Sequence, residues 1–172
     1  MTIAYKGINI QELEYRRWEN ASAEDPKEIY GLIDFCVDNI KPTDHLLELG
    51  CCLGASTSIF AQFAKKVTTA DVYFRAEAKK YLQKYNNIEY IEESSLNLAS
   101  ARPLNYDILY IDTIHTEDHC YKELKSLAPL CASNPKKIGG HDWWSEGVRN
   151  AAQKYFNKEP TKTYTDTSWI YC

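Results

Sequence analysis

Short apolar runs alternate with amphipathic stretches along most of this chain. Five apolar runs have the length of buried strands: 45–49, 67–72, 88–91, 106–111 and 137–140. The stretches between them have the spacing of helices, at 56–64, 75–85, 96–101 and 116–130. Strands that alternate with helices predict a parallel sheet with helices on both faces.

Both ends of the chain add to this pattern. A helix is expected over 25–40, where Pro26 stands near the start and apolar positions recur as far as Ile40. A last helix, 145–156, precedes two short strands, 162–165 and 168–171, which are too close for a helical crossover. The predicted fold is therefore α/β and doubly wound, with a mostly parallel seven-stranded sheet and a C-terminal antiparallel hairpin. We expect an arm or lid over 1–24 and a single domain over 25–172.

Composition narrows the class of protein. The 172 residues, 44% hydrophobic and 26% charged, fit one globular domain. No apolar stretch reaches the roughly 18 residues of a membrane span, and no signal peptide is evident, so we expect a cytoplasmic protein without a membrane partner. A net charge of −4, with basic residues scattered in pairs, makes long nucleic acid an unfavourable partner. The six cysteines include no C-x-x-C pair, which argues against a disulfide framework or a zinc site.

The first apolar run ends in Glu48, and a turn with Gly50 and Gly54 follows it. Glycine lets the backbone turn sharply and approach a ligand closely. Asp71 ends the next run, where a carboxylate can accept hydrogen bonds from two ribose hydroxyls of a nucleoside cofactor. Without a ligand, the turn would be a tight strand-to-helix connection and Asp71 an N-cap of the next helix.

The spacing of this turn argues against two common cofactor sites. It reads G-x-x-x-G, whereas a dinucleotide site reads G-x-G-x-x-G, and no Gly-Lys-Ser/Thr follows as in a P-loop. A cofactor that has a ribose but no phosphates fits better. A nicotinamide-dependent oxidoreductase is therefore the weaker alternative.

The segment Glu48–Gly54 resembles the E-x-G-x-x-x-G motif of class I S-adenosylmethionine-dependent methyltransferases. Segments 110–116 and 139–143 are similar to a subgroup of small-molecule O-methyltransferases of the macrocin type and cephalosporin hydroxylase-like proteins. That subgroup reads I-D-G-D-H and G-G-x-x-x-H-D there. The resemblance covers about 25–172. It implies a Rossmann-like methyltransferase that O-methylates a small hydroxylated molecule.

The resemblance also implies a set of S-adenosylmethionine contacts. Glu48 orients the first loop, Gly50 lies under the amino-acid portion of the cofactor, and Asp71 binds the ribose. Ser94 stands where the family has an acid that contacts the adenine amine, which is a departure. The complete set is Glu48, Gly50, Cys51, Gly54, Ser56, Asp71, Val72, Ser94, Ser95 and Asp112.

The candidate catalytic residues follow the last two parallel strands and are Asp112, His115, His141 and Asp142. A histidine or aspartate there can take the proton of a hydroxyl acceptor. Alternatively, Asp112, His141 and Asp142 hold Mg²⁺, although Thr113-Ile114 replaces the family's Gly-Asp and removes one ligand. A third alternative is a site that binds the cofactor without efficient turnover.

Other residues near these motifs have two interpretations each. Trp143 and Trp144 either wall an acceptor pocket or pack at a helix start. His119 either shares a helix face with His115 or, as we favour, faces solvent. Tyr73 either flanks the adenine or packs within the fold. The segment 15–18 is either a lid or a packing arm or dimer contact. The acceptor and any homo-oligomer stay open.

Overall fold

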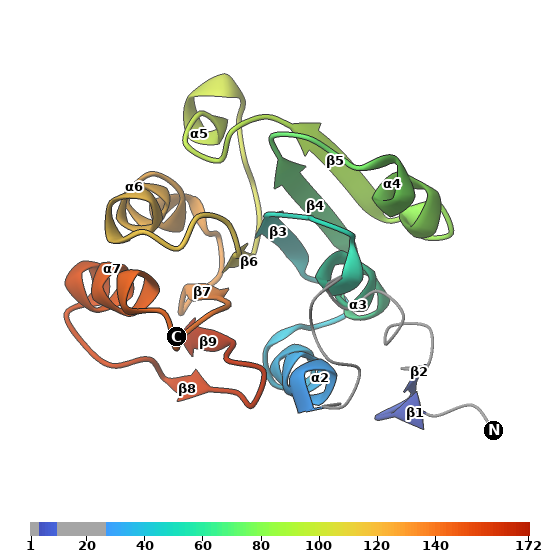
Figure 1. Cartoon of the computed structure of the whole chain (residues 1–172), viewed down its shortest axis with the longest axis horizontal. Coiled ribbons are helices and arrows are strands. Elements are labelled where there is room, and N and C mark those ends of the chain that lie inside the picture. Colours follow the sequence, from blue (N-terminus) through green and yellow to red (C-terminus); the bar gives the residue numbers. More distant parts are fainter. Residues whose placement is uncertain (1–3, 10–26) are drawn as a thin grey trace.

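A computed structural model describes residues 4–9 and 27–172. A seven-stranded sheet with the order β5-β4-β3-β6-β7-β9-β8 runs through its centre (Figure 1). The pairings among β3 to β7 are parallel, and β8 and β9 form an antiparallel hairpin beside β7. This confirms the predicted α/β sheet and its terminal hairpin. The strands are β3 (His45–Leu49), β4 (Lys66–Asp71), β5 (Ile88–Glu92), β6 (Ile108–Ile111), β7 (Lys137–Gly140), β8 (Lys162–Thr163) and β9 (Trp169–Tyr171).

Helices cover both faces of the sheet (Figure 1). One face packs against α2 (Lys27–Asn39), α3 (Ala55–Phe63) and α4 (Ala76–Leu82). The other packs against α5 (Leu98–Ala101), α6 (Glu117–Leu127), the 3-10 helix η1 (Ala128–Leu130) and α7 (Glu146–Phe156). Strand alternation produces the two cores: Leu46 lies in the first and Leu47 in the second. None of the helices within 4–9 and 27–172 is long and apolar enough to cross a membrane.

The predicted strands and helices are all present, and the differences lie at their ends. The run expected over 106–111 begins as a strand at Ile108, and Tyr106 makes an isolated bridge with Cys131. The helix expected over 116–130 ends at Leu127 and continues as η1, because Pro129 has no N–H to extend the helical hydrogen bonding. The helix expected over 75–85 ends at Leu82.

Part of the predicted N-terminal arm packs against α2. Strands β1 (Ala4–Tyr5) and β2 (Ile8–Asn9) form a small hairpin that the sequence pattern did not predict. The Tyr5 hydroxyl donates to Asp34 at 2.9 Å, and Lys6 pairs with the same carboxylate at 2.7 Å. Residues 1–3 and 10–26 lie outside the described part of the chain. They include the segment 15–18, so its role as a lid, packing arm or dimer contact stays a prediction.

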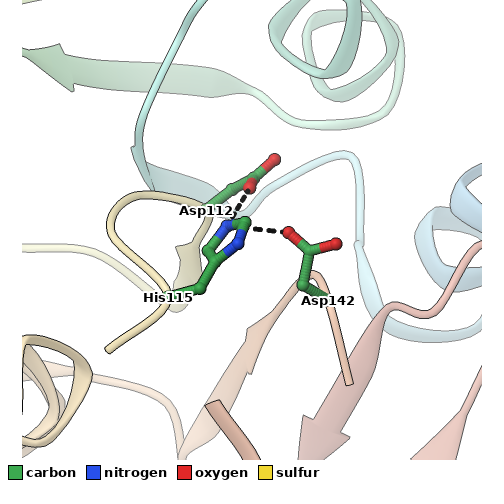
Figure 2. Close-up of side chains that lie close together, drawn as sticks. All are labelled: Asp112, His115 and Asp142. Carbon is green, nitrogen blue, oxygen red and sulfur yellow. Dashed lines mark ion pairs between the residues drawn. The ribbon is translucent and has the colours of Figure 1, made fainter. Parts of the chain in front are cut away.

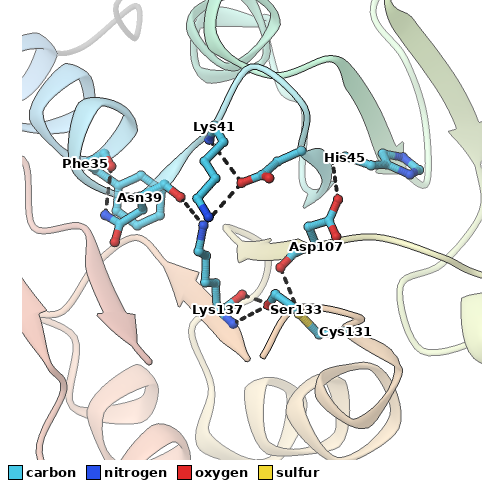
Figure 3. A network of polar contacts seen from close by, with 9 residues as sticks. Phe35, Asn39, Lys41, His45, Asp107, Cys131, Ser133 and Lys137 are labelled. Atoms are coloured by element: carbon cyan, nitrogen blue, oxygen red, sulfur yellow. Dashed lines mark hydrogen bonds and ion pairs between the residues drawn. The ribbon is translucent and has the colours of Figure 1, made fainter. Parts of the chain in front are cut away.

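A polar network joins the amino ends of the strands, opposite the edge where polar residues follow them (Figure 3). The Lys137 ammonium donates to the Asn39 carbonyl at 2.6 Å and pairs with Asp44 at 3.2 Å. The His45 backbone N–H donates to Asp107 at 2.8 Å. The start of β7 is thereby tied to the end of α2 and to the start of β3.

Replacing Lys137 by methionine is expected to lower the free energy of unfolding by about 2 kcal/mol. The Lys137 and Asp44 side chains are only 18% and 10% exposed, so the substitution leaves a shielded carboxylate without its cation. Urea denaturation measures the change. Lys122→Met is the matched control, because its partner Asp118 is 78% exposed and such pairs contribute little. Equal stability of the two variants would contradict the prediction.

Candidate functional site

A cavity of about 470 Å³ lies at the carboxyl edge of the parallel strands. The loops after β3, β4, β5, β6 and β7 all contribute to its wall, as expected for a ligand site in an open α/β sheet. Three predicted residues, Glu48, Gly54 and Asp142, are not part of the wall. Ten predicted residues line it: Gly50, Cys51, Ser56, Asp71, Val72, Ser94, Ser95, Asp112, His115 and His141.

The glycine turn after β3 has a conformation that other residues rarely adopt. Gly50 has a φ of 94°, and a Cβ atom there would collide with the carbonyl oxygen of Asp112. Gly54 has a φ of 82° at the N-cap of α3, where a Cβ atom would meet Leu82. The turn after β3 can therefore pack directly against the end of β6.

Glu48 supports this turn from within the core. Its carboxyl group is fully buried and accepts hydrogen bonds from Ser56, Thr57 and Thr69, the last at 2.7 Å. Burial raises the pKa of Glu48 to about 7, and the three hydroxyl donors oppose that rise. Since Ser56 lines the cavity, Glu48 reaches the cavity through its hydrogen-bond partner.

Asp71 ends β4 at the cavity wall, and its Oδ2 accepts the N–H groups of Cys51 at 2.8 Å and Cys52 at 3.2 Å. Its Oδ1 accepts a longer bond, 3.4 Å, from the Tyr73 N–H. The carboxylate thus bridges the glycine turn and the end of β4. Interpretation of Asp71 as an N-cap is wrong, because α4 begins five residues later and Arg75 occupies the cap position.

A second polar cluster lies across the ends of β6 and β7 (Figure 2). The Nε2 atom of His115 is 2.8 Å from Asp142 Oδ2 and 3.8 Å from Asp112 Oδ1. His141 Nδ1 is 3.3 Å from the other oxygen of Asp142, and the Trp144 indole N–H donates to that oxygen at 2.8 Å. The Asp142 carboxylate therefore contacts two histidines and an indole. Its backbone has a φ of 58°, in the left-handed region.

The carboxylates favour the charged form of both histidines. The carboxylates of Asp112 and Asp142 raise the pKa of His115, against the effect of burial. Burial by itself would lower the pKa of His141, but Asp142 and Asp112 outweigh it and raise this pKa to about 9. Burial likewise opposes ionisation of Asp142, while His141 and His115 hold its pKa below the usual range. At neutral pH the His141 imidazole is therefore in its charged form.

The group that can hold a cation differs from the predicted one. Asp112, His115 and Asp142 each offer a ligand atom, and these atoms lie within 4.8 Å of one another. His115 takes the place expected for His141, because it lies between the two carboxylates whereas His141 faces the far oxygen of Asp142. Thr113 donates to Glu123, so its hydroxyl is already engaged.

The structure corrects the prediction for His119 and decides between the two alternatives for Trp143. His119 is not solvent-exposed: its side chain is 17% exposed, lines the cavity and lies 3.2 Å from Glu123. Neither Trp143 nor Trp144 belongs to the cavity wall. Trp143 packs against Trp169 with ring centroids 5.9 Å apart, as the helix-start alternative expected.

The cavity wall also contains residues that the sequence pattern did not single out, among them Leu32, Ile59, Tyr110 and Asp166. Asp166 is 2% exposed and comes from the β8–β9 turn, more than 90 residues after the glycine turn. No local spacing links it to the other site residues. Only the packing of the terminal hairpin beside α2, where Gly31 leaves room for Asp166, brings it to the cavity.

Comparison with protein-family models and with curated proteins found no match. Solved structures do match. NodS, an N-methyltransferase from Bradyrhizobium japonicum in complex with S-adenosyl-L-homocysteine, aligns with a TM-score of 0.66 and 15% identity over 93% of this chain and 94% of NodS. An rRNA methylase from Streptococcus thermophilus aligns with a TM-score of 0.59 and 15% identity over 87% of this chain and 96% of that one.

The chain has a class I methyltransferase fold. YcgJ from Bacillus subtilis is also similar, with a TM-score of 0.54 and 12% identity. The alignment covers 65% of this chain and 50% of YcgJ. At these identities the similarity establishes the methyltransferase fold only. The substrate has to be inferred from the residues of the site.

Proposed function

We propose that this chain is a methyltransferase that binds S-adenosylmethionine in the cavity and methylates an oxygen of a small hydroxylated molecule. The observation that carries the proposal is one cavity that contains both an acid at the end of β4, beside the glycine turn, and a histidine–carboxylate cluster. Asp71 and Gly50 belong to the first feature, and Asp112, His115 and His141 to the second. The fold shared with NodS, which was solved with S-adenosyl-L-homocysteine, supports the choice of cofactor.

The arrangement suits a displacement at the sulfonium methyl group. The acceptor oxygen forms a bond to the methyl carbon while the carbon–sulfur bond breaks, and its electron pair stays on sulfur. The leaving group is good, so the main tasks of the protein are to position two reactants and to remove one proton. The groups at the cavity that can take the proton are the imidazoles of His115 and His141 and the carboxyl group of Asp112.

A divalent cation would be a second means of removing the proton, because it lowers the pKa of a hydroxyl group that it binds. Asp112, His115 and Asp142 would hold it, since their ligand atoms lie within 4.8 Å of one another. An imidazole ligand suits Zn²⁺ or Fe²⁺, whereas Mg²⁺ prefers oxygen, so this trio is a poor match to the predicted Mg²⁺. The set of metals in an activity test therefore includes Mn²⁺ and Zn²⁺ beside Mg²⁺.

Titration calorimetry tests the cofactor directly. We expect S-adenosylmethionine and S-adenosylhomocysteine to bind and NAD to give no signal, because the turn lacks the dinucleotide spacing. Absence of binding by both sulfur nucleosides would contradict the proposal. Binding of NAD alone would favour the oxidoreductase alternative.

In metal-free buffer, methyl transfer is expected to become faster between pH 7 and pH 9. The pKa of His141 is raised to about 9 and that of His115 is raised as well, so a histidine base gains activity as pH rises. The measurement is the rate of transfer to catechols, sugars, amines and a short RNA at each pH. A rate that stays flat over this range would contradict a histidine base.

A chelator separates the two ways of removing the proton. Insensitivity to the chelator supports the metal-free base, and loss of activity that Mn²⁺, Zn²⁺ or Mg²⁺ restores supports the cation. Cofactor binding without transfer to any acceptor, at any pH and with any of these metals, would leave the binding module as the function.

A further inference from the structure

Charge is distributed unevenly over the cavity wall. Among the described residues, the wall contains no lysine or arginine, and positive charge can reside there only on three histidines. The acids of the wall are Asp71, Glu93, Asp112 and Asp166. An acceptor with a phosphate or carboxylate group would therefore meet no permanent cation in this wall, whereas an acceptor with an amino group would meet several carboxyl groups.

Asp166 is the most buried of these acids, with 2% of its surface exposed, and it belongs to the turn between β8 and β9. Its carboxyl group accepts the backbone N–H of Ser168 at 3.1 Å and the Ser168 hydroxyl at 2.5 Å. Because Ser168 gives its one hydroxyl proton to Asp166, the Tyr110 hydroxyl, 2.7 Å away, donates to Ser168. The protons of this chain all point toward Asp166, as they do around an ionised carboxylate.

These hydrogen bonds leave Asp166 without a cation in direct contact. Burial raises the pKa of Asp166, while the Ser168 donors and the charge of His141 oppose the rise. The ion pairs within 4–9 and 27–172 do not include Asp166. A buried carboxylate with only neutral donors is costly, and its two oxygens have about four lone-pair positions. A cationic group that enters the cavity there would supply the missing partner.

Asp166 lies at the opposite end of the cavity from the acid proposed for the ribose. Asp71 ends β4, and β9 lies four strands further along the sheet, which is about 19 Å at the usual strand spacing. The ends of β6 and β7, with Asp112 and His141, lie between them. Since the end of β7 pairs with the start of β9, an acceptor hydroxyl beside His141 lies about one strand spacing from Asp166.

We propose that Asp166 binds a protonated amino group of the acceptor, so that the substrates of this site are small hydroxylated amines. The inference rests on the proposed function. A protonated amine has no lone pair with which to attack the sulfonium methyl group, whereas the hydroxyl group keeps its own. Pairing with Asp166 therefore positions the acceptor and directs the methyl group to oxygen.

Calorimetry on the S-adenosylhomocysteine complex at pH 7.5 compares two pairs of phenols that differ only by an amino group. The pairs are dopamine with 4-ethylcatechol and 3-(aminomethyl)phenol with 3-methylphenol. Wild-type protein is expected to bind the amine of each pair at least about tenfold more tightly, as for a charge-assisted hydrogen bond. Asp166→Asn keeps an oxygen for Ser168 without the charge, so the preference should fall below about threefold. Asp118→Asn, at a side chain that is 78% exposed, is the control and should keep the full preference.

The affinity for S-adenosylhomocysteine alone separates this inference from the proposed function. If wild-type protein does not bind this compound, the proposed function fails. If it does, equal affinities within both pairs, or no binding of any phenol, overturn only the inference. Weaker binding of S-adenosylhomocysteine by Asp166→Asn would assign Asp166 to the cofactor and would also overturn the inference.

If Asp166→Asn does not fold, Gly31→Ala decides. A Cβ atom at Gly31 would lie 2.3 Å from the backbone nitrogen of Asp166 and 2.6 Å from its carboxyl oxygen, so the added methyl group displaces the acid and keeps its charge. Gly31 is not part of the cavity wall. A reduced preference for the amines in Gly31→Ala supports the inference, and a full preference overturns the role of Asp166.

Discussion

Replacing Asp71 by alanine is expected to weaken the binding of S-adenosylhomocysteine by about 100-fold. The carboxylate is the acceptor proposed for the ribose hydroxyls, and hydrogen bonds to a charged group contribute about 1.5–3 kcal/mol each. The same group holds the N–H groups of Cys51 and Cys52, so its removal also loosens the glycine turn. Titration calorimetry of folded variant protein measures the loss.

Two further variants show which part of the loss belongs to the ribose. Asp71→Asn keeps an oxygen for the backbone of the turn and is expected to lose about tenfold, because the hydrogen bonds become neutral. Glu92→Ala is the matched control: Glu92 lies opposite Asp71 on the neighbouring strand and does not line the cavity. An affinity of Asp71→Ala equal to that of the control would remove Asp71 from the binding site.

The stability of the protein is expected to fall by about 3 kcal/mol relative to a Glu48→Gln variant as pH rises from 4.5 to 8. Burial raises the pKa of Glu48 from 4.5 to about 7, so the folded state holds a proton that the unfolded state has already released. Stability from this group is complete below pH 4.5 and is lost as pH rises through 7. Glutamine does not titrate, so the variant lacks this slope.

Urea denaturation at several pH values measures the difference in free energy of unfolding between wild type and Glu48→Gln. The contributions of the other titrating groups cancel in this difference. Glu89→Gln is the control, because ion pairing with Lys66 lowers the pKa of Glu89 and its slope has the opposite sign. Parallel stability curves for wild type and Glu48→Gln would show that Glu48 has an ordinary pKa. The three hydroxyl donors to Glu48 would then outweigh its burial.

The sequence by itself determined the order of elements and the position of the glycine turn. The apolar run along 45–49 predicted β3 to the residue, because a parallel strand that is buried on both faces has a nearly continuous apolar sequence. The sequence also indicated that Gly50 and Asp71 lie close together. They follow neighbouring parallel strands, whose carboxyl ends meet at one edge of the sheet.

Only the tertiary structure decided which polar groups pair. His115 instead of His141 lies between two carboxylates because the end of β7 turns through a left-handed Asp142, which no periodicity reports. His119 is shielded by its buried partner Glu123. Asp166 reaches the cavity through the terminal hairpin. Hydrophobic periodicity records which face of an element is buried, whereas the partner of a buried charge depends on side chains that meet from distant elements.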